Sequence, residues 1–320
     1  MTLKYEPSLD GLRALAVLAV ICYHARAPFA LGGARGVEVF FVLSGYLITS
    51  QLAGGDLSVL EFWKRRALRL APALILMVGL TVAFAPVAIP QYAATAPRDG
   101  LLAATYLMNV AEGLRPWDNP FMHTWSLAAE AQFYLAWPFL LPILARWHPA
   151  ITLPALWLAF TGLQAAVTAF TPFEGYYFPH FGGLALGAAV AYLPPMNRWA
   201  AAAGLGAILM AFINPALPAP LAEAGAAMLV SAVRLPCAVG SLLSVRPLTR
   251  MGLISYGVYL YHFPIHCAFE ATPWFVRGGA ALGGSLALGA LSFHFVEKPL
   301  RGRRMRPAIY AAQLTTHDLS

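Results

Sequence analysis

The chain has 320 residues and a formal net charge of +7; 59% of its residues are hydrophobic and 11% are charged. Soluble domains carry about 25% charged residues, so this composition excludes a soluble globular protein and predicts a polytopic membrane protein. A single helical bundle can contain such a chain, because apolar side chains can face lipid. Cytoplasmic basic clusters that attract the anionic headgroups of membrane lipids explain the positive charge. We therefore expect no nucleic acid partner.

Apolar segments recur along the chain and predict an all-α fold, a polytopic transmembrane bundle of about ten spanning helices. The segments around Asn109 and before Ile213 are shorter than the roughly 20 residues that a spanning helix needs, so at least one candidate is expected not to cross. Eleven candidates lie near residues 10–27, 36–53, 71–89, 99–112, 123–145, 151–170, 176–193, 198–213, 218–235, 251–270 and 276–297.

Basic residues follow the second and the last of these segments, at 64–69 and 298–306. By the positive-inside rule both clusters and the N-terminus are cytoplasmic, which requires an even number of crossings. We therefore expect one integral membrane domain over residues 1–306 and a short, flexible cytoplasmic tail over residues 307–320.

The first apolar segment contains two ionisable residues, Arg13 and, eleven positions later, His24. Ionisable side chains within a membrane helix are costly, so their presence indicates a functional site. Eleven residues make almost three helical turns, which places both side chains on one face about 16 Å apart. If Asp10 marks the cytoplasmic boundary, His24 lies about 21 Å along the helix, beyond the middle of the ~30 Å hydrocarbon core.

Arg66 and Arg69 precede the third apolar segment. At a spacing of three they project from one face of a helix and could grip a phosphate together. The alternative is a positive-inside anchor, which charge alone favours. A membrane-embedded histidine in the same chain favours a soluble phosphorylated donor that arrives from the cytoplasm.

Glu130 lies inside the segment expected to span the membrane from residue 123 to residue 145. A carboxylate there is expected to pair with a cation or a histidine of a neighbouring helix. The alternative is a purely structural role, for instance a tie to Arg13. His262 and His266 have a spacing that could hold a metal, but no matching third ligand stands nearby, so we expect no metal site and two interfacial histidines.

Six motifs, taken in order, resemble those of the membrane-bound acyltransferase family 3, the OafA/YrhL-like enzymes, over nearly the full length. Glu38 stands where that family more often has Asp, and residues 146–250 match little. The motifs are residues 9–13 with His24, residues 36–46, the Arg66 and Arg69 pair, and residues 123–130, 254–262 and 295–301.

The resemblance implies an O-acyltransferase of the plasma or inner membrane, transferring groups other than aminoacyl groups. The group, commonly acetyl, would pass from cytoplasmic acyl-CoA to a hydroxyl of a carbohydrate or another exported acceptor. His24 would act as general base, because a histidine is mostly neutral near pH 7, and Glu130 would orient or charge-balance it. Transient acylation of His24 is a competing mechanism. Arg66 and Arg69 would bind the CoA phosphates, and Arg13 would contact the donor or hold Glu130.

Candidate pocket residues are Asp10, Ser44, Tyr46, Trp125 and Ser126. The chain ends soon after its last basic cluster, without the esterase-like domain that some relatives append. We therefore expect the membrane part to perform the whole reaction or to pass acyl groups to a separate partner protein. Two rival functions are a non-catalytic transmembrane acyl shuttle and a small-molecule transporter, which would leave the thioester intact.

Overall fold

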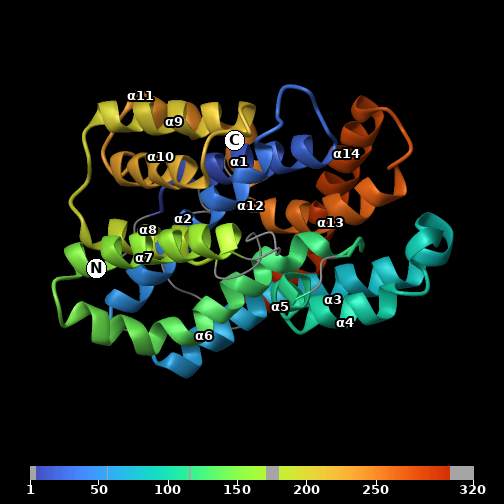
Figure 1. The fold of residues 1–320 in the computed structure, drawn as a ribbon, viewed down its shortest axis with the longest axis horizontal. Helices are drawn as coiled ribbons and strands as arrows, with labels where there is room; N and C mark the ends of the chain where they lie inside the picture. Colours follow the sequence, from blue (N-terminus) through green and yellow to red (C-terminus); the bar gives the residue numbers. More distant parts are fainter. Residues whose placement is uncertain (1–4, 56, 115–116, 171–179, 303–320) are drawn as a thin grey trace.

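The computed structural model describes residues 5–55, 57–114, 117–170 and 180–302. This part of the chain is helical and contains no strand, which confirms the all-α prediction (Figure 1). The tail expected over residues 307–320 lies outside the described residues. The α-helices are α1 (Pro7–His24), α2 (Gly36–Ala53), α3 (Val59–Ala88), α4 (Ala96–Ala104), α5 (Met108–Leu114), α6 (Trp125–Ala145), α7 (Pro149–Phe170), α8 (Gly182–Tyr192), α9 (Arg198–Ile213), α10 (Ala219–Ala232), α11 (Ala238–Leu243), α12 (Arg246–Leu253), α13 (Ser255–Ala268), α14 (Trp274–Ser292) and α15 (Lys298–Gly302).

Five helical stretches in the described residues are long and apolar enough to cross a membrane. The chain is therefore an integral membrane protein, and length and composition alone support half of the ten or so expected crossings. Three shorter apolar helices, α8, α9 and α10, accompany them. The five stretches are Gly33–Ala53, Val59–Ala88, Met122–Ala145, Pro149–Ala169 and Trp274–Leu300.

The apolar segment expected near residues 99–112 is not one helix. It forms α4, of nine residues, and α5, of seven residues. Between them Tyr106 has a φ of 56°, a left-handed conformation that interrupts a right-handed helix. Neither piece reaches the roughly 20 residues of a spanning helix.

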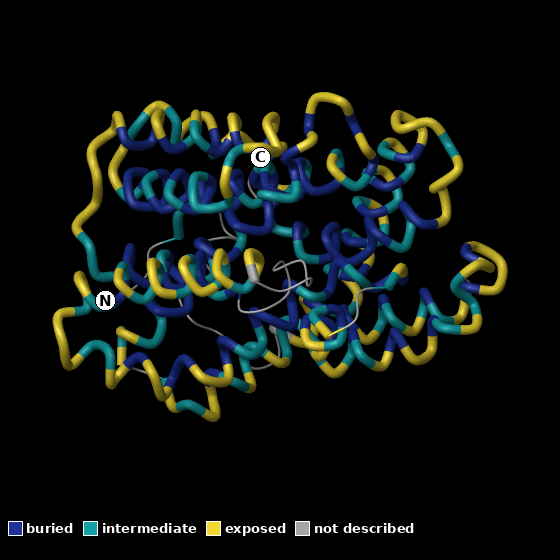
Figure 2. The backbone as a smooth tube through the Cα atoms, in the orientation of Figure 1, coloured by how far each residue is buried: buried dark blue, intermediate teal, exposed yellow. Residues whose placement is uncertain are grey.

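Helices α1 and α2 run through the interior of the bundle. Figure 1 places α2 between α9 and α10 at one edge and α3 and α6 at the opposite edge. Figure 2 shows α1 and α2 mainly buried, whereas α7 is mainly exposed although it is apolar, as expected for a helix that faces lipid.

Small residues allow the interior helices to approach closely. A Cβ atom at Gly45 of α2 would lie 2.0 Å from the carbonyl oxygen of Leu184 in α8, and a Cβ at Gly187 would lie 2.0 Å from that of Val42. Backbone contact of this kind is typical of membrane helices, which associate through packing. It fixes α2 against α8.

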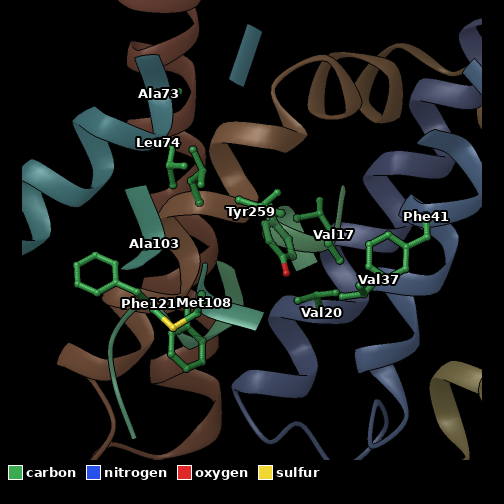
Figure 3. Close-up of a cluster of buried hydrophobic side chains, with 14 of the residues drawn as sticks. Val17, Val20, Val37, Phe41, Ala73, Leu74, Ala103, Met108, Phe121 and Tyr259 are labelled. Carbon is green, nitrogen blue, oxygen red and sulfur yellow. The ribbon is translucent and has the colours of Figure 1, made fainter. Parts of the chain in front are cut away.

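Buried apolar side chains join α1 and α2 to α13. Val17, Val20, Val37, Phe41 and Tyr259 gather in one cluster (Figure 3). Because lipid is as apolar as these side chains, such a cluster stabilises the bundle through van der Waals packing. This packing sets the distance between the polar groups that the three helices carry.

Candidate functional site

A cavity of about 90 Å³ lies where α1, α2, α3, α6 and α13 meet. Apolar and tyrosine side chains and Ser255 make up the rest of its wall. The cavity thus brings together candidates that are far apart in the sequence. Six of the residues singled out from the sequence line it: Arg13, Ser44, Arg66, Arg69, Ser126 and Glu130.

Arg66 and Arg69 form the basic part of the cavity wall, as their spacing on α3 predicts. The guanidinium of Arg66 donates to Oε1 of Gln51 and lies over the rings of Phe62 and Tyr134, at 5.5 and 5.8 Å from their centroids. These contacts fix the direction of the Arg66 side chain. They leave it in reach of the cavity, where a phosphate could bind.

Arg13 pairs with Asp10, three residues before it on α1. Asp10 is buried, and it also accepts a hydrogen bond from Tyr5 Oη at 2.9 Å. The contact partner of Arg13 is therefore Asp10, not Glu130. Asp10 does not line the cavity; it orients a residue that does.

Glu130 is held within the cavity by two hydroxyls. Ser44 Oγ donates to its Oε1 at 2.6 Å, and Tyr134 Oη donates to its Oε2 at 3.0 Å. Both carboxylate oxygens thus have partners, and the expected contact with His24 is not among the hydrogen bonds of the described residues. Glu130 thus lines the cavity together with the arginines, and its hydrogen-bond partners there are Ser44 and Tyr134.

His24, at the end of α1, pairs instead with His262 of α13. Its Nδ1 lies 3.0 Å from His262 Nε2. His262 Nδ1 lies within hydrogen-bond distance of the carbonyl oxygen of Tyr259, which can only accept. That nitrogen therefore carries the proton, and a neutral His262 has its lone pair on Nε2.

These contacts assign the tautomer of His24 from the hydrogen-bond network. His262 Nε2 accepts, so His24 Nδ1 donates, and the lone pair of His24 then resides on Nε2. An imidazole held in this way is ready to accept a proton at Nε2.

Three further rings surround this pair. The centroids of Phe263 and His266 lie 4.8 and 6.1 Å from that of His24, and His123 lies 5.3 Å from His262. His262 and His266 are buried, and the ring of Phe263 lies 6.1 and 5.5 Å from theirs. In the described part of the chain no group of His, Cys, Asp and Glu side chains is arranged to hold a metal ion.

Ser126 and Tyr259 lie between the cavity and the histidines. Both line the cavity, and their hydroxyl oxygens are 2.8 Å apart. Tyr259 Oη also donates to the carbonyl of His123 at 2.9 Å, and the Tyr259 ring lies 5.4 Å from that of His262. Tyr259 of the cavity wall thus adjoins His262, the partner of His24.

Two further pocket candidates, Tyr46 and Trp125, lie outside the cavity wall, as Asp10 does. Tyr46 packs in an apolar cluster between α1, α2 and α10. The ring of Trp125 lies 6.1 Å from Phe41 and 5.1 Å from His180. Their motif neighbours Ser44 and Ser126 reach the cavity, because successive helical positions point in different directions.

The sequence did not predict a second buried polar cluster. His180 Nε2 lies 2.8 Å from Glu38 Oε1, His180 Nδ1 lies 2.9 Å from the Gln164 amide, and Trp157 donates to Glu223 at 2.6 Å. These groups tie α2 to α7 and α10. Glu38, a carboxylate inside an apolar run, was the one sign of this cluster in the sequence. Its partners lie within residues 146–250, which match little of the family pattern.

Comparison with curated proteins finds relatives over almost the whole chain. The peptidoglycan O-acetyltransferase OatA of Listeria monocytogenes is 32% identical over 352 aligned positions, 93% of this chain and 56% of the relative. YrhL of Bacillus subtilis is 33% identical, over 95% of this chain and 56% of the relative. The O-acetyltransferase OatA of Staphylococcus aureus is 29% identical, over 93% and 57%.

The chain thus spans a little over half the length of these curated relatives. No solved structure matches it significantly. The family model described as an acyltransferase domain matches residues 6–272. Because that match covers most of the chain, including the cavity and the histidines, the protein belongs to the acyltransferase 3 family.

Proposed function

We propose that this protein transfers an acyl group, in the simplest case acetyl, from cytoplasmic acyl-CoA to a hydroxyl of a carbohydrate on the other side of the membrane. The observation that carries the proposal is the tautomer of His24, which leaves a lone pair on Nε2; its partner His262 adjoins Tyr259, in the wall of a cavity that Arg66 and Arg69 also line. The relatives named for peptidoglycan O-acetylation support a polysaccharide acceptor.

The donor enters from the end of the cavity that carries Arg66 and Arg69. Their guanidinium groups bind the phosphates of CoA. The thioester arm lies among the apolar and tyrosine side chains of the wall and reaches past Ser126 and Tyr259 to His24.

The chemical step needs one base and one acid, and His24 supplies both. Its Nε2 takes the proton of the acceptor hydroxyl while the hydroxyl oxygen attacks the thioester carbonyl carbon. The C–S bond then breaks, and the CoA sulfur receives the proton from His24. One ester and one thiol are formed, and the histidine returns to its neutral state. His262 keeps Nε2 of His24 unprotonated at the start.

Release of CoA from acetyl-CoA by detergent-purified protein, with cell-envelope extract as acceptor source, tests the proposal. Wild-type protein is expected to release CoA in an extract-dependent manner, and His24→Ala is expected to lose this activity. His294→Ala is the matched control, because His294 is an exposed histidine away from the cavity wall. Full activity of folded His24→Ala would remove His24 from the mechanism. An intact thioester with wild-type protein would favour a transporter, and CoA release without an acylated acceptor would favour an acyl shuttle.

A further inference from the structure

Arg277, in the first turn of α14, is a buried cation that lacks a counterion in the described structure. Its side chain is largely shielded, with 7% of the residue exposed, and Nη2 donates to the carbonyl of Thr272 at 2.8 Å. Nε and Nη1 have no hydrogen-bond partner among the described residues. A guanidinium stays protonated in proteins, so this charge is both buried and incompletely bonded.

A charge left in this state is destabilising, and an ionisable residue in a membrane segment is by default a candidate functional residue. The ion pairs found in the described part of the chain do not include Arg277. Three buried N–H bonds, one on Nε and two on Nη1, therefore lack an acceptor among the described residues. An oxyanion would satisfy both the charge and the hydrogen bonds.

The position of Arg277 connects it to His24. A Cβ atom at Gly278, the next residue, would lie 3.2 Å from Cβ of Ala25, the residue that follows His24. The rings of Phe29 and Trp274 are 5.6 Å apart and join the same two segments. The start of α14 thus packs directly on the end of α1.

Two more polar groups face this region. His266 has a buried Nδ1 with no partner in the described structure, and its ring lies 6.1 Å from that of His24. The positive charges of Arg277 and Arg26 both act on His266. Arg26 is exposed and has a φ of 60°, a left-handed conformation that a non-glycine residue adopts at an energetic cost.

We infer that Arg277, with His266 and Arg26, forms a binding site for a carboxylate or phosphate carried by the hydroxyl acceptor, close to the hydroxyl that His24 deprotonates. This inference rests on the proposed function and adds the charge of the acceptor to it. The donor phosphates bind at Arg66 and Arg69, on the cavity wall beyond Ser126 and Tyr259. Two separate basic groups thus hold two different anionic substrates.

Label transfer from radioactive acetyl-CoA to cell-envelope extract tests this site. The acetylated product, separated from acetyl-CoA, is expected to be retained on an anion exchanger at pH 7. Loss of retention after phosphatase treatment identifies a phosphate, and loss after carbodiimide coupling to a neutral amine identifies a carboxylate. A product that is not retained is neutral and overturns the inference while leaving the proposed function intact; absence of any transfer by wild-type protein overturns the proposed function itself.

Kinetics of Arg277→Gln give a second, independent result. Hydrogen bonds to charged groups are worth about 1.5–3 kcal/mol, so the extract concentration for half-maximal rate is expected to rise at least about tenfold. The half-saturating acetyl-CoA concentration is expected to stay unchanged. Arg277→Lys keeps the charge and is expected to be intermediate, and it replaces the glutamine variant if that variant does not fold.

Arg250→Gln is the matched control for these kinetics. Arg250 is an exposed arginine of α12, the helix that packs against Asp10 at the opposite end of α1. The Arg250→Gln protein is expected to have the wild-type half-saturating concentrations of both acetyl-CoA and extract. The assignment would be contradicted if Arg277→Gln raised the half-saturating concentration of acetyl-CoA instead of that of the extract. It would also be contradicted if the substitution changed neither concentration.

Discussion

His262 controls the tautomer of His24, and its replacement separates hydrogen bonding from packing. His262→Gln places an amide oxygen where Nε2 accepts, so it is expected to keep substantial activity. His262→Leu fills the space without an acceptor, and its kcat is expected to fall by about 10²–10⁴, the range in which general bases contribute. The measurement is kcat for CoA release with saturating acetyl-CoA and extract.

The folded state of both His262 variants is checked by size-exclusion chromatography and by acetyl-CoA binding. A leucine variant with wild-type kcat would show that His24 does not need this partner. Equal losses in the glutamine and leucine variants would indicate that His262 acts only through packing.

Arg66 and Arg69 are expected to act on donor affinity. Because each guanidinium can form charge-assisted hydrogen bonds worth about 1.5–3 kcal/mol, Arg66→Ala with Arg69→Ala should raise the half-saturating acetyl-CoA concentration at least tenfold. Arg65→Ala is the control, since Arg65 pairs with Glu61 on the same helix and does not line the cavity. Unchanged acetyl-CoA saturation in the double variant would restore the positive-inside anchor as the role of this pair.

Predictions about single residues succeeded where they depended on the geometry of one helix alone. The spacing of Arg66 and Arg69 predicted a common face, and both line the cavity. The partner of His24 could not be predicted, because His262 is 238 residues away and belongs to another helix. Periodicity tells which face a residue occupies but not which helix lies opposite, so Glu130 and His262 were equally available as partners.

At the scale of elements, the contact between α2 and α8 depends on the absence of a side chain at Gly45. Gly45→Ala would place a Cβ 2.0 Å from a backbone oxygen, so the helices must separate. Overpacking of this kind typically costs about 1–3 kcal/mol, and a lower midpoint of thermal unfolding in detergent is expected. Gly79→Ala in α3 is the control, because no atom lies within 4 Å of its added Cβ.

A Gly45→Ala protein as stable as Gly79→Ala would show that this approach of the two helices is looser than described. The same comparison also reports on the cavity, since Ser44 precedes Gly45 and donates to Glu130. A shift of α2 is therefore expected to lower acetyl transfer together with stability.

Helix positions were largely predictable from apolar runs, but one interruption was not. The run near residues 99–112 was expected to be short for a span, but not to break at Tyr106 into α4 and α5. A left-handed residue of this type is set by tertiary contacts and leaves no mark in the composition. Hydropathy predicts where a helix is tolerated, and packing decides where it ends.

At the scale of the whole molecule, the proposed orientation places the chain before α1 in the cytoplasm and the α1–α2 connection on the other side. Cysteines introduced at Phe29 and at Leu60, both exposed, flank α2 and test this. The native Cys22, Cys237 and Cys267 are free thiols and are first replaced by alanine. In right-side-out vesicles an impermeant maleimide is expected to label Phe29→Cys and to spare Leu60→Cys until detergent is added.

The reverse labelling pattern would invert the molecule, and with it the side from which acetyl-CoA arrives. Equal labelling of both positions would mean that α2 does not separate two compartments. Either result would contradict the two-sided reaction while leaving membership of the acyltransferase family unaffected.

The hydroxyl pair of Ser126 and Tyr259 has a consequence for the cell as well as for the reaction. An enzyme reached from both faces of a membrane must keep protons and ions from leaking between them. If the donor enters on one side of this pair and the acceptor on the other, the contact is a seal across which part of the membrane potential falls. Widening it, as in Tyr259→Ala, would then dissipate the ion gradient of the cell even in the absence of substrate.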